Sequence, residues 1–259
     1  MILAYNTFLA PPLNRMSNLE QLSLYFLNHH GPIIDGVFVE KNIINRMTRL
    51  KKFTFNICSI APFNNQVNLP SNEYIQNTFR TFQSDPIISC VDYFSKADEF
   101  HCHIYSYPYA LTYYNDIMNN FPRGLFKYVR EVYLFDERPF DYDFFLQIAQ
   151  YFPLMEKLIL HNREPQKNNN QQRSIIEYPH LTQLDLVRTH ENYVEQFLVN
   201  TKMSLLNSVY LHGDNDSLER VTHTFIRDAT RIRDRNRTEP NSNHLFKNIV
   251  ELNRTQPNF

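Results

Sequence analysis

The chain has 259 residues, and its formal net charge of −1 gives no overall field that would attract nucleic acid or an anionic membrane. Only four glycines are present, which excludes the Gly-rich phosphate loops of the common nucleotide-binding proteins. No segment approaches the roughly 18 consecutive apolar residues of a membrane span, and residues 1–10 lack the basic region of a secretory signal.

A short apolar motif recurs along the chain. In each copy an apolar residue is followed by two free positions, a second apolar residue, one free position and a third apolar residue. The clear copies are Leu19, Leu22 and Leu24; Leu50, Phe53 and Phe55; Val129, Val132 and Leu134; Met155, Leu158 and Leu160; Leu181, Leu184 and Leu186; and Leu206, Val209 and Leu211. A weaker copy is Ala97, Phe100 and Cys102.

The spacing of these copies indicates a stacked repeat. The last four clear copies start at residues 129, 155, 181 and 206, so the steps are 26, 26 and 25 residues. Each copy predicts a short strand, because its second and third apolar residues are two positions apart and side chains in a strand alternate between faces. One strand cannot bury its apolar face alone, so neighbouring copies must stack to form a continuous core.

Helical patterns separate the predicted strands. Four residues have the side chain and position of a helix N-cap: Ser71, Asp141, Thr189 and Asp216. The helix after Ser71 is expected to carry Ile75, Phe79 and Phe82, and the helix after Asp141 to end near Tyr151. Proline ends a helix, and three aromatic–proline pairs precede predicted strands: Phe121-Pro122, Phe152-Pro153 and Tyr178-Pro179.

These elements predict an α/β fold, a curved leucine-rich-repeat-like solenoid of short parallel strands with helices on the outer face. We expect one irregular solenoid over residues 1–259, with a flexible polar loop at 163–174 and a flexible linker at 234–243 before a terminal segment. The alternative is an ordinary α/β domain with a buried parallel sheet.

The sequence offers few residues for catalysis or metal binding. His101 and His103 would share one face of a strand around Cys102, but no further ligand has the spacing of a metal site, so we expect neither a metal nor a cofactor. The thiols of Cys58, Cys90 and Cys102 lie in or near apolar runs and are expected to be free and buried, which suits the cytoplasm or the nucleus.

Two strand segments, Met47–Phe55 and Tyr178–Leu186, resemble the leucine-rich repeats of F-box proteins. The resemblance extends from about Met16 to Leu211 and implies a module that holds a protein destined for ubiquitination. In that family an F-box recruits the ligase core, and nothing before Met16 has the length of an F-box, so the ligase core is an expected partner only if an F-box exists upstream.

The resemblance also concerns the residue that follows each strand. In the family a Cys or Asn after the third apolar position bonds the loop backbone, and Cys58 fits that place. The equivalent later residues do not fit, so irregular loops are expected there: Glu137, Arg163, Thr189 and Asp214.

The favoured hypothesis is a non-catalytic module that binds another protein, and neither nucleic acid nor membrane, through the solvated face of its strands. The alternatives are an enzyme with a scattered active site on an ordinary α/β domain, and a structural remnant without a partner. The residues expected on the binding face are Ser23, Tyr25, Thr54, Asn56, Tyr133, Phe135, Ile159, His161, Asp185, Tyr210 and His212.

Overall fold

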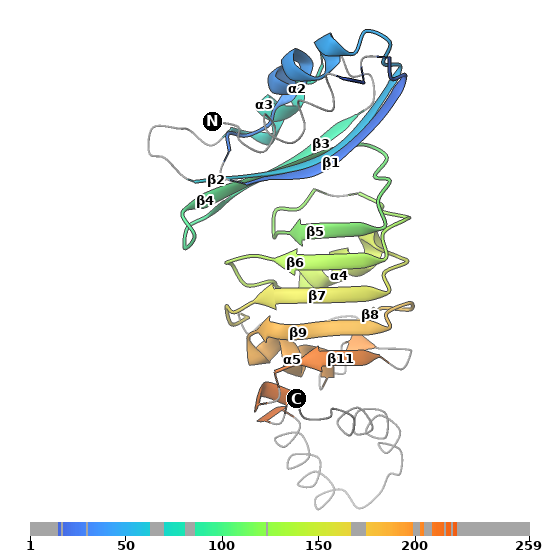
Figure 1. Cartoon of the computed structure of the whole chain (residues 1–259). Helices are drawn as coiled ribbons and strands as arrows, with labels where there is room; N and C mark the ends of the chain where they lie inside the picture. Colours follow the sequence, from blue (N-terminus) through green and yellow to red (C-terminus); the bar gives the residue numbers. More distant parts are fainter. Residues whose placement is uncertain are drawn as a thin grey trace, which may run out of the picture. The chain divides into compact units, whose positions relative to one another are not determined.

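The computed structural model shows an α/β protein whose chain divides into two compact units (Figure 1). The structure describes residues 15–16, 18–29, 31–62, 70–80, 86–122, 124–166, 175–198, 203–204, 209–214, 216–218 and 220–221. Unit 1 comprises Met1–Ala110 with Asn120–Arg123, and unit 2 comprises Leu111–Asn119 with Gly124–Phe259. The sequence predicts one solenoid over the whole length, and the division into two units differs from that prediction.

Unit 1 contains a mixed four-stranded sheet in the order β1-β2-β4-β3. Its strands are β1 (Gln21–His29), β2 (Lys52–Pro62), β3 (Ile87–Phe94) and β4 (Glu99–Ser106). β1 and β2 are parallel, and their register pairs Leu22 with Phe53 and Leu24 with Phe55, so the first two motif copies lie side by side as predicted.

The weak third copy is not a repeat. Phe100 and Cys102 are buried on β4, but β4 runs antiparallel to both β2 and β3. Ala97 lies in the turn that joins β3 to β4. A tight turn allows an antiparallel pair, whereas parallel strands need a longer crossover, and only four residues separate β3 from β4.

Short helices cover one face of the unit 1 sheet (Figure 1). They are α2 (Gly36–Asn42), the 3-10 turn η2 (Ile44–Arg46) and α3 (Asn72–Asn77). Ser71 caps α3 by accepting a hydrogen bond from the Tyr74 N–H at 3.1 Å, which confirms the predicted cap. Ile75 and Phe79 are buried, although Phe79 follows the end of the helix, and Phe82 lies outside the described residues.

Unit 2 contains an entirely parallel five-stranded sheet in the order β11-β9-β7-β6-β5. Its strands are β5 (Tyr113–Ile117), β6 (Glu131–Phe135), β7 (Lys157–Asn162), β9 (Gln183–Thr189) and β11 (Tyr210–Gly213). A separate parallel pair joins β8 (Ile176–Glu177) and β10 (Met203–Ser204). Leu134, Leu160, Leu186 and Leu211 lie on successive neighbouring strands, which confirms the pairing predicted from the motif.

The backbone repeats the same hydrogen bonds where these strands begin. The carbonyl of Arg130 accepts hydrogen bonds from the N–H groups of Glu156 and Lys157, and the carbonyl of Glu156 accepts from Thr182 and Gln183. Buried apolar residues precede these points in each copy, including Val129, Met155 and Leu181. The motif copies of unit 2 therefore share a local geometry.

The last motif copy has a different register. A step of 25 residues predicts Leu211 opposite Leu186, but Leu211 pairs with Leu184 and Gly213 pairs with Leu186. Leu211 is only half-buried, whereas Leu184 and Leu186 are each 1% exposed. The final copy is thus shifted by two residues, which preserves the face of each side chain because strands alternate with a period of two.

Two helices cover one face of the unit 2 sheet, α4 (Tyr142–Tyr151) and α5 (Glu191–Leu198) (Figure 1). Asp141 caps α4 by accepting from the Phe144 N–H at 2.8 Å, as predicted. Thr189 does not cap α5: it ends β9, and its hydroxyl donates to the Leu186 carbonyl at 2.7 Å.

The cap predicted at Asp216 is also wrong. Residues 216–218 are helical, and Asp214 accepts hydrogen bonds from the Ser217 N–H and hydroxyl at 3.2 and 3.0 Å. The loop expected at 163–174 starts, as far as Gln166, without helix or strand. Residues 167–174 lie outside the described residues, as does the whole of 234–243. Among the helices of the described segments, none is long and apolar enough to cross a membrane.

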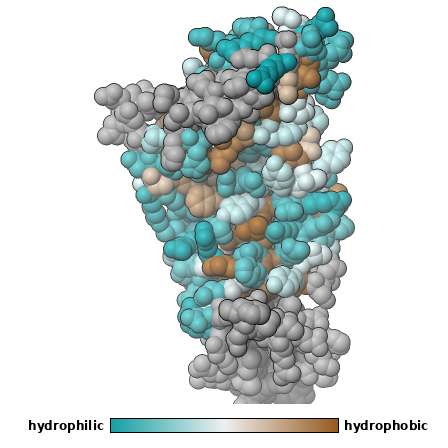
Figure 2. Space-filling view, viewed as in Figure 1, coloured by the Kyte–Doolittle hydropathy of each residue, from teal (hydrophilic) through white to brown (hydrophobic). Residues whose placement is uncertain are grey.

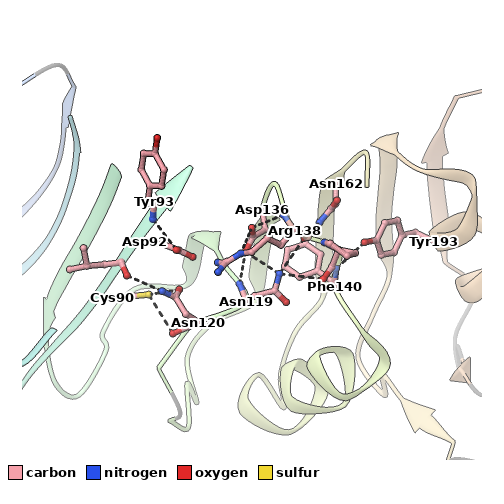
Figure 3. Close-up of polar contacts among 12 residues, drawn as sticks. Cys90, Asp92, Tyr93, Asn119, Asn120, Asp136, Arg138, Phe140, Asn162 and Tyr193 are labelled. Atoms are coloured by element: carbon pink, nitrogen blue, oxygen red, sulfur yellow. Dashed lines mark hydrogen bonds and ion pairs between the residues drawn. The ribbon is translucent and has the colours of Figure 1, made fainter. Parts of the chain in front are cut away.

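After β5, the first strand of unit 2, the short segment Asn120–Arg123 belongs to unit 1 again. Asn120 donates its side-chain amide to the Val91 carbonyl at 2.8 Å, and the Cys90 thiol lies 3.2 Å from the Asn120 Oδ1 atom (Figure 3). The chain therefore passes between the units after Ala110, Asn119 and Arg123.

Candidate functional site

One face of the unit 2 sheet is not covered by α4 and α5, and we call it the open face (Figure 1). Side chains alternate along these strands, so the motif leucines are buried toward the helices while Tyr133, Ile159 and Asp185 are half-buried on the opposite side. Figure 2, viewed from the open side, shows hydrophobic residues among hydrophilic ones on this surface.

The parallel register brings the predicted face residues of unit 2 together in rows. One row is formed by Tyr133, Ile159, Asp185 and His212. The next row toward the ends of the strands pairs Phe135 with His161, and Tyr210 lies on the other side of the first row, opposite Gln183. All seven residues predicted here lie on the same sheet.

Tyr133 and His161 form a hydrogen-bonded pair on this face. The Tyr133 hydroxyl bonds the Nδ1 atom of His161, and the two rings meet edge to face with centroids 4.8 Å apart. Burial and the charge of Arg188 lower the pKa of His161, so its imidazole is neutral. In the tautomer in which Nδ1 accepts the tyrosine proton, the Nε2 atom of His161 carries the ring hydrogen and is a donor.

Asp185 and His212 form a second pair, with His212 Nδ1 2.8 Å from Asp185 Oδ2. The other carboxylate oxygen accepts the Val187 N–H at 3.1 Å. Burial alone raises the pKa of Asp185, but the hydrogen bonds from His212 and Val187 outweigh it and lower the pKa below its ordinary value. Asp185 is therefore charged near neutral pH and already has donors on both oxygens.

A bulge in β9 adds a residue that the sequence reasoning missed. The register between β7 and β9 shifts, so that Ile159 pairs with Asp185 but His161 pairs with Arg188. Strict alternation from Asp185 would turn Arg188 toward the core, whereas the bulge leaves it exposed opposite His161. The sequence does contain a signal for the bulge: Arg188 occupies a position where strand alternation predicts a buried side chain, and arginine is rarely buried.

The other four predicted face residues lie in unit 1. Ser23 and Thr54 are register partners whose hydroxyl oxygens are 2.8 Å apart, and Tyr25 is paired with Asn56. The Asn56 amide bonds His103 Nε2 at 2.6 Å and the Tyr109 hydroxyl at 2.8 Å. Asn56 thus has a role inside unit 1, while Tyr25 is 41% exposed.

The histidines around Cys102 share one face as expected but are held in the interior. His103 is 5% exposed, and burial lowers its pKa to about 4. Burial, together with the charge of Asp35, raises the pKa of the Cys102 thiol to about 12, so the thiol is protonated and unreactive. No cluster of three or more His, Cys, Asp or Glu residues suited to a metal ion occurs within the described ranges.

A buried polar network joins the loops after β5, β6 and β7 in unit 2 (Figure 3). Asp136 accepts the N–H groups of Asn119 and Arg138 at 2.8 and 2.9 Å, and its carboxylate also pairs with the Arg138 guanidinium at 3.1 Å. Asn162 donates its amide to the Arg138 carbonyl at 2.7 Å and accepts the Glu164 N–H at 2.9 Å.

Glu137 and Arg163 were expected not to fit the role of bonding the loop backbone, and the structure shows their preceding neighbours in that role. The side chains that bond the loop backbone are Asp136 and Asn162, one position before the Glu137 and Arg163 that the resemblance indicates. Asp136 is 5% exposed and Asn162 2% exposed. Because each joins its own loop to a neighbouring one, their role is to hold the ends of the strands in register.

No family model, no curated protein and no solved structure matches this chain.

Proposed function

We propose that this chain is a non-catalytic protein-binding module that contacts its partner through the open face of unit 2. The observation that carries the proposal is the set of large, partly exposed side chains in neighbouring rows of this face, at Tyr133, Ile159 and Phe135, with Tyr210 58% exposed on the same sheet. Aromatic residues are enriched in protein interfaces and among the residues that dominate binding energy. The hydrogen-bonded parallel strands hold the backbone of these residues in place before binding, which reduces the entropy lost on association.

Within this proposal, unit 2 is a leucine-rich-repeat-like solenoid. The steps of 26 residues, the parallel strands and the repeated hydrogen bonds to Arg130 and Glu156 support it. By resemblance to the repeats of F-box receptors, the bound protein would be a substrate for ubiquitination. A ligase core would join only through an F-box upstream of this chain.

The test compares capture by the tagged chain and by the double variant Tyr133→Ala/Tyr210→Ala. Tyr128→Ala is the matched control, because Tyr128 is 62% exposed in unit 2 but lies in a turn outside the strands. Captured proteins are quantified by mass spectrometry, and thermal unfolding checks that each variant folds. We expect at least one protein to be retained by the parent and the control but reduced about tenfold or more by the double variant.

If the double variant captures the same proteins in the same amounts as the parent, the open face is not the binding surface. The ubiquitination proposal is tested by adding a sample in which the chain carries an F-box upstream, because the ligase core should be captured in that sample and be absent from the others. Capture of the ligase core by this chain alone contradicts the requirement for an upstream F-box.

A further inference from the structure

Two arginines border His161 at one end of the open face. The β9 bulge pairs Arg188 with His161 across neighbouring strands, and Arg163 follows His161 by two positions along the chain. Both arginines are exposed. Within the part of the chain that the structure describes, neither guanidinium has a hydrogen bond or ion pair; their charges do act on the His161 imidazole, whose pKa they lower.

Several carboxylates of the unit 2 sheet and its loops have partners other than these arginines. Asp185 is bonded to His212 and to the Val187 N–H, and Asp136 is paired with Arg138. Glu131 pairs with Lys157 at 3.6 Å, and Asp116 on β5 is separated from β9 by β6 and β7. Among the residues that the structure describes, none takes up the positive charge of Arg163 or Arg188 by a hydrogen bond or ion pair, so this charge can attract a group from outside.

We propose that Arg163, His161 and Arg188 form a carboxylate-binding site, and that the protein partner places a short Asp- or Glu-rich segment on it. The inference rests on the proposed function and specifies the chemistry of the partner. Guanidinium groups bind carboxylates through paired N–H···O bonds, and His161 supplies a further donor in the tautomer that carries the ring hydrogen on Nε2. Phe135, which pairs with His161 in the same row, offers apolar contact beside the charges.

The charge balance of the site is positive. The two guanidinium groups outnumber the one carboxylate, Asp185, that acts on the His161 ring together with them. The attraction by the arginines and the repulsion by Asp185 both scale with the charge of the bound group, so the phosphoserine peptide in the experiment below is the comparison that separates a carboxylate ligand from a phosphate.

The experiment uses the 259-residue chain and a fluorescently labelled hexaglutamate peptide, with binding measured by fluorescence anisotropy at low ionic strength. The variant Arg163→Gln/Arg188→Gln removes both guanidinium groups. The matched control Arg130→Gln/Arg220→Gln removes the same charge from arginines that already pair with Glu156 and Glu191. Thermal unfolding checks each variant, and a hexalysine peptide tests the sign of the charge.

We expect the Arg163→Gln/Arg188→Gln variant to bind hexaglutamate about tenfold more weakly or worse, since hydrogen bonds to charged groups are worth about one factor of ten or more. The control should change affinity by less than about twofold. Equal binding by the parent and the Arg163→Gln/Arg188→Gln variant overturns the site, as does stronger binding of hexalysine. A phosphoserine peptide that binds about tenfold more tightly than hexaglutamate overturns the carboxylate assignment in favour of phosphate.

The outcome is separable from that of the proposed function. Partner capture that depends on Tyr133 and Tyr210 but not on Arg163 and Arg188 supports the open face and overturns the carboxylate site. Hexaglutamate binding that depends on the arginines, without any capture that depends on the tyrosines, supports the site and overturns the aromatic contact surface.

Discussion

Leu184 lies directly opposite Leu158 on the neighbouring parallel strand, and the two side chains are 1% and 0% exposed. Leu211 on β11 pairs with Leu184 from the other side. Leu184 is thus at the centre of the apolar layer between the unit 2 sheet and its helices, while its sequence neighbours Gln183 and Asp185 lie on the open face.

Replacing Leu184 by Asp should unfold unit 2. The change loses the burial of a leucine, which is worth about 1.5–3 kcal/mol, and places a carboxylate among apolar side chains, so we expect a total loss above about 4 kcal/mol. Circular dichroism during thermal unfolding measures it. The control Gln183→Asp adds the same group on the open face and should change stability by less than about 0.5 kcal/mol. Equal melting of both variants would contradict the assigned faces.

The regular part of unit 2 could be predicted from the sequence because burial and strand alternation act locally. The spacing of Leu134, Leu160 and Leu186 is enough to predict neighbouring strands, and the cap at Asp141 needs only its own helix. The same reasoning assigned Tyr133 and Ile159 to the side opposite the motif leucines.

Features that depend on tertiary structure could not be predicted in this way. The antiparallel direction of β4 is decided by its pairing with β2 and β3, which the motif at Phe100 and Cys102 does not report. The bulge that exposes Arg188 and the shifted register of Leu211 depend on the neighbouring strands. Local hydrogen bonding placed the loop contact at Asp136 and not at Glu137.

Gly36→Ala should destabilise unit 1. A Cβ atom at Gly36 would lie 2.1 Å from the Thr78 carbonyl oxygen, and the Gly36 N–H already donates to the Thr78 hydroxyl at 2.7 Å. The backbone must shift to accept the methyl group, so we expect a loss of about 1–3 kcal/mol. In the matched variant Gly124→Ala, the nearest atom to the new Cβ is a Phe126 ring carbon at 3.4 Å, an ordinary contact. Urea unfolding that ranks Gly124→Ala as the more damaging change would refute this explanation.

Asp136→Ala should loosen the loops at the ends of the unit 2 strands. The change removes the acceptor for the Asn119 and Arg138 N–H groups and leaves buried donors without a partner, at a cost of about 2–4 kcal/mol. Hydrogen exchange should increase at Asn119 and Arg138, and the urea midpoint should fall. Glu195→Ala, on the exposed side of α5, removes the same charge and should leave both measurements close to the parent. Unchanged hydrogen exchange at Asn119 would contradict this role of Asp136.

Unit 1 should lose stability in mild acid because of His103. Its pKa is lowered from 6.5 to about 4 by burial, so the unfolded chain binds the proton more readily. The contribution is fully present above pH 6.5 and is lost as the pH falls toward 4, by about 3 kcal/mol. NMR titration of His103 should give a midpoint near 4, and His103→Gln should flatten the pH dependence of the urea midpoint. A midpoint at the ordinary value would contradict the buried, neutral state.

Because the chain passes from one unit to the other after Ala110, Asn119 and Arg123, a single break cannot separate the two units into complete fragments. A fragment that stops at Ala110 deprives the Val91 carbonyl and the Cys90 thiol of Asn120. A fragment that starts at Gly124 removes β5 and leaves β6 as a bare sheet edge, which invites aggregation. Separate expression of the halves therefore calls for overlapping pieces, residues 1–123 and 111–259, each carrying the short stretch that the other also contains.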